Sequence, residues 1–413
     1  MQRLRKAPGV HMRRLRLVRG VRMHRLRTVT AGIAVAAVAV VVASTAPAFA
    51  DPIGNNGKPI APQSYDVVGV GANTDDGLFN QLSVDYNKTI PASKHSASHP
   101  YFYSWNATLP GSSSTVPTTI VPKAGCKSIT RPNGSTAGLN ALKISQQIAG
   151  GHYCIDFARS SSGRSSSSPP LGPGGVIYVA LAEDAVTYAT RDTGGTKTVP
   201  NTYAPKNLTT AQLKNIFLCN YTNWKQVGGP NQPIKAYLPQ TGAGTLSFWL
   251  KALGINAAGS CVNESLEENQ GQSKQFNSPN AIFIYSVADW IAQKYHSAAC
   301  GKTPTGTQNK YGCNQTGYLG LNSVKVGSTV YSPITTAKVP TINKAFSATH
   351  LTRTIYDILR WTSATPDHIL SRLEPFFASA HAKVKGYACA NPTAIKDIED
   401  YGFLTVSTCG VGS

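Results

Sequence analysis

The chain has 413 residues and a formal net charge of +20 at pH 7, from 39 Lys and Arg against 19 Asp and Glu. A chain of this length is too long for one small hydrophobic core and is typical of a protein with two lobes. Ten of the basic residues lie between Met1 and Arg27, and the others are scattered singly, without a basic run. The charge therefore predicts attraction to anions but excludes the clustered footprint of a nucleic-acid-binding protein.

Residues 1–50 have the composition of an export signal. A basic segment without acids is followed by an almost unbroken run of Ala, Val and Ile from Ala31 to Val42, and then by Ala48-Phe49-Ala50. This order is typical of a secretory signal peptide cleaved after Ala50. An uncleaved anchor is the alternative, because the apolar segment is nearly long enough to cross a bilayer. We expect a secreted or extracytoplasmic protein of the cell envelope, and cleavage would halve its net charge.

All eight cysteines lie beyond this segment. An even number of cysteines in an oxidising compartment predicts disulfides, although the sequence leaves their connectivity open. No Cys-x-x-Cys spacing is present, so a metal site is not expected. Pairing of neighbours along the chain is the simplest arrangement. It would join Cys126 to Cys154, Cys219 to Cys261, Cys300 to Cys313 and Cys389 to Cys409.

Beyond Asp66, short apolar runs alternate with helical patterns, which is typical of an α/β fold. Strands are expected over Val67–Val70 and Val176–Leu181. The apolar spacing predicts a series of helices as well. These helices are expected over residues 78–86, 209–217, 246–253 and 353–361.

Three loops rich in Gly, Ser and Thr precede predicted elements of helix. They are Gly69–Thr74, Asn133–Gly138 and Thr241–Thr245. Glycine lets a ligand approach the backbone, hydroxyls donate hydrogen bonds, and helix N-termini present unpaired amides with a partial positive charge. Each loop alone could be a turn before an ordinary helix cap. Their joint occurrence predicts one site for an anion or another polar ligand.

The order of these segments resembles the phosphate-binding proteins of bacterial ABC transporters, a family of two-lobed periplasmic-type solute-binding proteins. The resemblance covers roughly residues 66–403, and the chain looks like a divergent member. It is carried by Gly69-Val70-Gly71-Ala72, RPNGSTAGLNALK (131–143), NLTTAQLKNIFLCNYTNWKQVGG (207–229) and LPQTGAGTLSFWLKALG (238–254).

The resemblance implies an α/β, two-lobed periplasmic-binding-protein-like fold with crossing strands and a ligand cleft that closes by a hinge. After a linker over residues 51–65, the first lobe would comprise residues 66–182 and 344–413. The second lobe would comprise residues 183–343.

Ligand-binding roles can be carried over for several positions. Ser135 matches a serine that contacts phosphate in the family. Gly244 and Thr245 match the glycine amide and the threonine of the phosphate loop. Asn73 and Thr74 fall where the first loop of the family contacts the ligand.

The chain departs from the family pattern where charge is expected. Ser161 and Thr241 stand in place of aspartates, and Pro239 stands in place of the arginine that pairs with phosphate. Ala243 replaces the usual serine of the phosphate loop. An arginine fork offers bidentate, charge-assisted bonds, and a carboxylate distinguishes protonated phosphate from sulfate. The loops thus predict a neutral cradle. Arg159 is either the missing positive charge or a solvated arginine at a loop edge.

We expect a monomeric solute-binding protein that needs no cofactor and is not an enzyme, because hydrolase and nucleotide-binding motifs are missing. Its ligand would be a small oxyanion, with phosphate first by resemblance, and its partner an ABC transporter permease. The alternative is a secreted or cell-wall-associated protein that keeps the receptor fold but is not coupled to a transporter.

Overall fold

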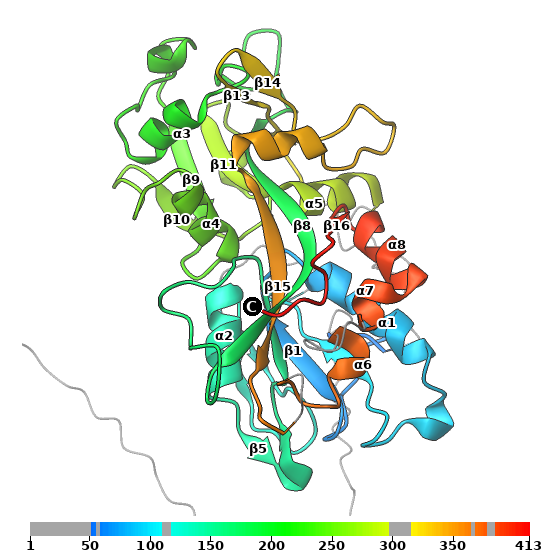
Figure 1. The fold of residues 1–413 in the computed structure, drawn as a ribbon. Coiled ribbons are helices and arrows are strands. Elements are labelled where there is room, and N and C mark those ends of the chain that lie inside the picture. The colour runs from blue at the N-terminus through cyan, green and yellow to red at the C-terminus, as the bar shows by residue number, and fades with distance from the viewer. Residues whose placement is uncertain (1–50, 55–57, 110–116, 297–314, 365–367, 378–384) are drawn as a thin grey trace, which may run out of the picture. The chain divides into compact units, whose positions relative to one another are not determined.

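The computed structural model describes residues 51–413 except 55–57, 110–116, 297–314, 365–367 and 378–384 (Figure 1). The predicted signal peptide and the predicted Cys300–Cys313 pair therefore lie outside the described residues.

The described part of the chain is built on one mixed sheet. Its strands follow the order β10-β9-β11-β8-β15-β7-β1-β2, and β12 and β16 also pair with β8. These strands are β1 (Val67–Gly71), β2 (Phe102–Ser104), β7 (Phe157–Ser160), β8 (Val176–Arg191), β9 (Lys235–Pro239), β10 (Asn263–Leu266), β11 (Ala281–Ser286), β12 (Leu319–Leu321), β15 (Thr352–Arg360) and β16 (Leu404–Thr405).

Three short hairpins lie outside this sheet and pair β3 with β4, β5 with β6 and β13 with β14. Their strands are β3 (Thr119–Ile120), β4 (Ile129–Thr130), β5 (Gln147–Ile148), β6 (His152–Tyr153), β13 (Val324–Val326) and β14 (Thr329–Tyr331). The α-helices of the described residues are α1 (Asp76–Lys88), α2 (Ser135–Lys143), α3 (Thr210–Phe217), α4 (Gly244–Ala252), α5 (Val287–Ile291), α6 (Glu374–Phe377), α7 (Tyr387–Ala390) and α8 (Pro392–Asp400).

The two longest strands of the sheet, β8 and β15, pair with each other near its middle. The first part of β8 pairs with β15, and its second part pairs with β11, antiparallel in both cases. On either side, β1 pairs in parallel with β2 and β7, and β9 pairs in parallel with β10 and β11. β8 and β15 are thus the crossing strands expected from the sequence (Figure 1). The predicted boundary between residues 182 and 183 falls inside β8, so lobes divided there would share a continuous strand.

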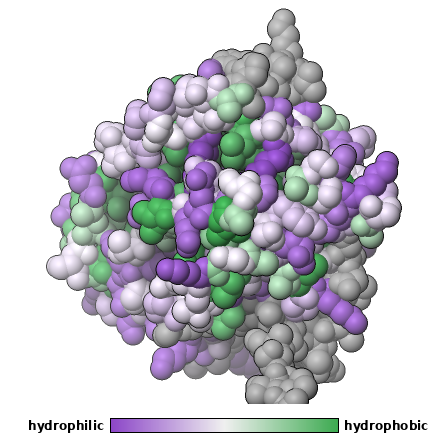
Figure 2. All heavy atoms as spheres, turned by 90° about the horizontal axis from the view of Figure 1, so that it is seen from below, coloured by the Kyte–Doolittle hydropathy of each residue, from purple (hydrophilic) through white to green (hydrophobic). Residues whose placement is uncertain are grey.

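Both faces of the sheet are covered. Val67 and Phe157 belong to one apolar cluster, whereas Val68 and Ala158 belong to another, because successive strand residues point to opposite faces. Figure 1 shows α1, α7 and α8 packed together beside the sheet. On the face of the molecule in Figure 2, hydrophilic and hydrophobic residues are interspersed.

The predicted helix over residues 353–361 is wrong, because this segment is strand β15. Ile355, Ile358 and Leu359 are all buried and have the spacing of a helical stripe. In the strand, Ile355 and Leu359 belong to one apolar cluster and Ile358 belongs to the other, because both faces of β15 are covered. A strand that is buried on both faces can therefore imitate the helical pattern.

The other predicted elements are confirmed, with changed ends. α3 begins after Thr209, which forms a capping box with Gln212. β8 continues ten residues beyond the predicted end at Leu181, through Glu183 and Asp184.

Three of the four predicted disulfides are confirmed: Cys126–Cys154, Cys219–Cys261 and Cys389–Cys409. The described part of the chain contains no free cysteine. It also contains no helix with the length and apolar character needed to span a membrane.

Replacing Cys389 and Cys409 together by serine is expected to lower the free energy of unfolding by about 3 kcal/mol, because this bridge closes a loop with a sequence separation of 20. It ties α7 to the segment after β16. Urea denaturation of the variant and the wild type measures the difference. An unchanged midpoint would show that the bridge does not constrain the unfolded chain.

Candidate functional site

The three small-residue loops predicted from the sequence lie in contact. The Gly134 amide donates to the Gly71 carbonyl at 3.1 Å, and the Thr136 amide donates to the Gly242 carbonyl at 3.3 Å. The hydroxyls of Thr74 and Thr245 lie 3.4 Å apart. Residues separated by more than 100 positions along the chain therefore share one place in the fold.

Five residues from these loops and from the end of β7 form what we call the hydroxyl cradle: Thr74, Ser135, Ser161, Gly244 and Thr245. The Ser161 amide donates to Ser135 Oγ at 3.0 Å. A Cβ on Gly244 would lie 2.3 Å from the hydroxyl oxygens of both Ser135 and Ser161. The four hydroxyl residues are at most 4% exposed. Only glycine permits this approach between α4 and the two serines.

The helices that begin at the cradle differ from three other helices of the described residues, α3, α5 and α8. No side chain caps α1, α2 or α4 at its N-terminus. In contrast, α3, α5 and α8 are capped by Thr209, Ser286 and Asn391. Uncapped N-termini leave amide donors and a partial positive charge without a side-chain partner. This arrangement is typical of sites that bind anions or carboxylates.

A carboxylate from the segment after β10 reaches the cradle. Thr74 Oγ1 donates to Glu268 Oε1 at 3.0 Å, and the Thr245 hydroxyl also bonds this carboxylate. Glu268 Oε2 has no partner, although the residue is fully buried. Burial raises the pKa of Glu268, while Arg353 and the two threonine hydroxyls oppose that rise.

The neighbouring Glu267 bonds two residues that are far apart in the sequence, Asn133 and Gln240, which also bond each other. Asn133 Nδ2 donates to Glu267 Oε2 at 2.9 Å, and Gln240 Nε2 donates to Glu267 Oε1 at 3.2 Å. Burial raises the pKa of Glu267 to about 7, since the hydrogen bonds from Asn133 and Gln240 offset only part of the desolvation. We call these three residues the Glu267 latch.

An arginine of the crossing strand β15 contacts Thr74. Arg353 Nη2 is 3.3 Å from Thr74 Oγ1 and 2.8 Å from Asp184 Oδ2. Its Nη1 is buried without a hydrogen-bond partner. The guanidinium also lies 5.5 Å from the centre of the Phe248 ring of α4.

The chain matches the model of a known protein family. The model of the PBP superfamily domain matches residues 112–356. The chain belongs to the PBP superfamily. The two-lobed periplasmic-binding-protein class predicted from the sequence is thereby confirmed. No curated protein matches the chain.

Solved structures similar to this PBP domain have low sequence identity. An ABC-type phosphate transport receptor from Vibrio cholerae is 16% identical, with a TM-score of 0.46 over 83% of this chain and 100% of that one. A putative phosphate ABC transporter substrate-binding protein with bound phosphate from Clostridium perfringens is 13% identical, with a TM-score of 0.46 over 83% and 100%.

The remaining site residues predicted for this PBP domain differ in how far they are buried. Asn73 is buried, and its Oδ1 accepts from Asn269 Nδ2 at 3.5 Å. Ala243 is buried at the start of α4, whereas Thr241 is exposed. Its neighbour Gly242 accepts a hydrogen bond from the Thr136 amide, but Thr241 itself is exposed.

Arg159 is fully buried, so it is not the solvated arginine of the alternative interpretation. Its Nε and Nη2 donate to the carbonyl of Ala72, its Nη2 also donates to that of Trp105, and its Nη1 donates to Ser104 Oγ. Asp75 lies 3.5 Å from its Nε. The guanidinium therefore holds the first loop together.

Sequence reasoning missed Glu267, Glu268 and Arg353. The only local signal was the polar run Glu267–Gln270 after an apolar residue, in a chain with few acids. All four residues of this run are at most 3% exposed. A fully buried polar run is unusual, because such groups are seldom buried without partners.

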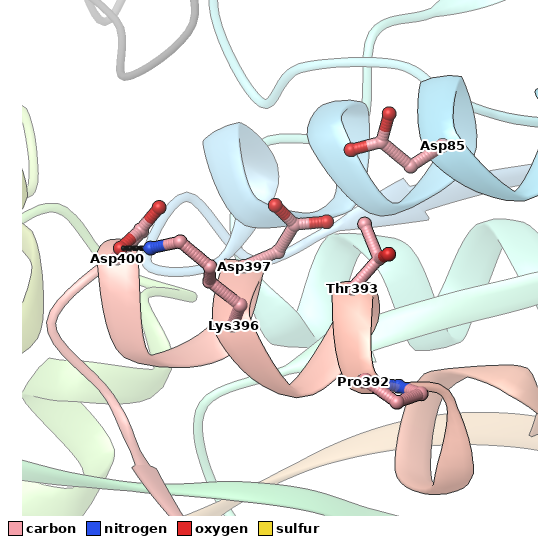
Figure 3. Close-up of a pocket in the computed structure, with 6 residues that line it drawn as sticks. All are labelled: Asp85, Pro392, Thr393, Lys396, Asp397 and Asp400. Atoms are coloured by element: carbon pink, nitrogen blue, oxygen red, sulfur yellow. Dashed lines mark hydrogen bonds and ion pairs between the residues drawn. The ribbon is translucent and has the colours of Figure 1, made fainter.

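Two surface cavities lie elsewhere. One, of about 360 Å³, lies between α1 and α8, where Figure 3 shows the Lys396 ammonium against Asp400, at 2.6 Å. Another, of about 290 Å³, lies beside the Cys389–Cys409 disulfide. The first is lined by Asp85, Pro392, Thr393, Lys396, Asp397 and Asp400.

Proposed function

We propose that this PBP domain is an extracytoplasmic solute-binding protein that binds phosphate or a closely related small oxyanion. It would act as a monomer and deliver its ligand to the permease of an ABC transporter. The observation that carries the proposal is the position of Thr74. Its hydroxyl lies between the Thr245 hydroxyl and the Glu268 carboxylate, where three uncapped helices begin.

The chemistry of the cradle suits an oxyanion that still carries a proton. Hydroxyls and helix amides would donate to the oxygens of the anion. Glu268 Oε2, which lacks a partner, would accept the proton of a P–OH group. Phosphate keeps such a proton at neutral pH, whereas sulfate does not. Glu268 thus offers the carboxylate that Ser161 and Thr241 do not provide, and we expect discrimination against sulfate to be retained.

Ligand entry requires the loops to separate. The cradle residues are buried, and Gly244 lies against Ser135 and Ser161. The continuous strand β8 is the natural place for a hinge between the predicted lobes, because its first part pairs with β15 and its second part pairs with β11. The disulfides of the described residues support an oxidising, extracytoplasmic location, which agrees with the predicted signal peptide.

Calorimetric titration with phosphate and sulfate tests the proposal. Wild type is expected to bind phosphate and to reject sulfate. Glu268→Gln is expected to weaken phosphate binding about 10- to 100-fold and to reduce the preference over sulfate, because a hydrogen bond to a charged group contributes about 1.5–3 kcal/mol. Glu264→Gln, in the neighbouring strand β10, is the matched control.

Two other outcomes have clear meanings. If Glu268→Gln bound phosphate more tightly than wild type, the Glu268 carboxylate would occupy the anion position itself and compete with the ligand. If wild type bound neither anion in calorimetry, the oxyanion-receptor proposal would be wrong.

A further inference from the structure

We propose that Arg353, from the crossing strand β15, supplies the positive charge that the oxyanion needs. This inference rests on the proposed function and names a specificity-determining residue within the same site. The sequence places proline where the family arginine is expected, and no residue of the phosphate loop replaces its charge. The structure provides a cation from a different strand.

The position of Arg353 is fixed by its neighbours in the sheet. Arg353 and Asp184 are directly paired across β15 and β8. Arg353 Nε and Nη2 donate to Asp184 Oδ2 at 3.1 and 2.8 Å. Asp184 Oδ1 accepts from Ser286 Oγ and from the Ala288 amide, at 3.0 and 3.1 Å. One edge of the guanidinium is therefore held firmly.

The other edge is available to a ligand. Arg353 Nη2 contacts Thr74 Oγ1 in the cradle, and Nη1 has no partner although the side chain is only 3% exposed. A buried N–H group without a partner costs free energy that a bound anion would recover. An arginine oriented by a carboxylate loses little further conformational freedom when it binds an oxyanion.

Arg159, the cation predicted from the sequence, is less suited to this role. Its Nε, Nη1 and Nη2 groups all donate to groups of the protein, and Asp75 lies beside it. Arg353 Nη1 has no such partner. Of the two buried arginines near the cradle, Arg353 is therefore the one with a donor available.

Thr74 also contacts a carboxylate that has an unmatched acceptor oxygen. Glu268 Oε2 and Arg353 Nη1 both lack partners, and Thr74 Oγ1 contacts both side chains. A ligand with one O–H donor and an anionic oxygen would satisfy both groups. Singly protonated phosphate has this pattern, whereas a dication or an uncharged ligand would leave Arg353 unmatched.

The test is calorimetric titration with inorganic phosphate of wild type, Arg353→Lys and Arg353→Gln. We expect Arg353→Gln to weaken binding about 10- to 100-fold and Arg353→Lys to recover part of the loss, because lysine keeps the charge without the fork. Arg191→Gln removes another buried arginine, one that bonds carbonyls of Pro200, Asn201 and Asn277, and is expected to leave affinity unchanged.

Removing Arg353 leaves Asp184 unpaired, which could unfold the protein. The double variant Arg353→Gln with Asp184→Asn removes both charges and separates folding from binding. Weak phosphate binding by a double variant with a near-wild-type melting temperature supports the assignment. Phosphate binding within twofold of wild type would overturn it while the proposed function stands. If wild type itself bound no phosphate, the proposed function and this assignment would both be wrong.

Discussion

Gly244→Ala is expected to lower phosphate affinity at least tenfold, because the added methyl group would lie within 2.3 Å of the hydroxyl oxygens of Ser135 and Ser161. This methyl would either fill the place of the anion or hold the loops apart. In both cases the donors could not converge on one ligand, and closure would lose contacts that ordinarily contribute several kcal/mol to binding.

Titration of Gly244→Ala against wild type measures the effect. Gly163→Ala is the matched control, since a Cβ at that position would meet only Tyr356, at an ordinary 3.4 Å. The melting temperature of ligand-free Gly244→Ala shows whether the change also loosens the ligand-free form. Unchanged affinity in Gly244→Ala would mean that the ligand does not bind between α4 and the two serines.

The sequence allowed the loops of the site to be located because their signal is local. Glycines and hydroxyl residues at the ends of strands mark Ser135, Gly244 and Thr245, and these residues do lie together. One shared site for the three loops was predicted from their joint occurrence in the sequence, and the family resemblance then suggested the roles of individual residues.

The charged residues of the site had no comparable local signal. Thr74 and Glu268 are 194 positions apart, and nothing near either residue marks the contact. Arg353 was assigned to a helix, so its pairing with Asp184 across two strands could not be foreseen. The strand predicted to end at Leu181 continues through Asp184, although an unpaired buried carboxylate is costly. Arg353, Ser286 and Ala288 offset that cost in the fold.

Arg159 shows a different limit of sequence reasoning. In the sequence it stands beside a serine-rich segment, which is typical of a solvated loop. In the fold, β7 lies between β1 and β15, so the residue is fully buried. Burial depends on strand order, which the sequence of a single chain does not specify.

The ligand-free protein is expected to become less stable as the pH rises from 5 to 8. The pKa of Glu267 is raised from 4.5 to about 7 by burial, and that of Asp75 from 3.8 to about 7. The folded chain therefore binds more protons than the unfolded chain in this range. Stability then falls as the pH rises, and the loss is complete above the folded pKa.

Glu267→Gln isolates the contribution of the latch. The shift of the Glu267 pKa corresponds to a penalty on the order of 3 kcal/mol at pH 8, of which only about a quarter is present at pH 5. The carboxyl of Glu267 faces the amide groups of Asn133 and Gln240, and the charges of Glu268 and Asp76 also raise its pKa. A glutamine remains neutral at both pH values, and its single carbonyl oxygen can still accept from one of the two amide groups.

The measurement is the melting temperature of wild type and of Glu267→Gln, without ligand, from pH 5 to 8. We expect the variant to melt at a higher temperature than wild type, by a margin that grows as the pH rises. The melting temperature of the variant should still fall somewhat as the pH rises, because burial also raises the pKa of Asp75 and that of Asp76, the latter to about 6. Glu264→Gln, which changes the same charge outside the latch, should follow the wild-type curve. Parallel curves for wild type and Glu267→Gln would mean that the carboxyl of Glu267 is solvated and that the latch does not hold the cradle closed in solution.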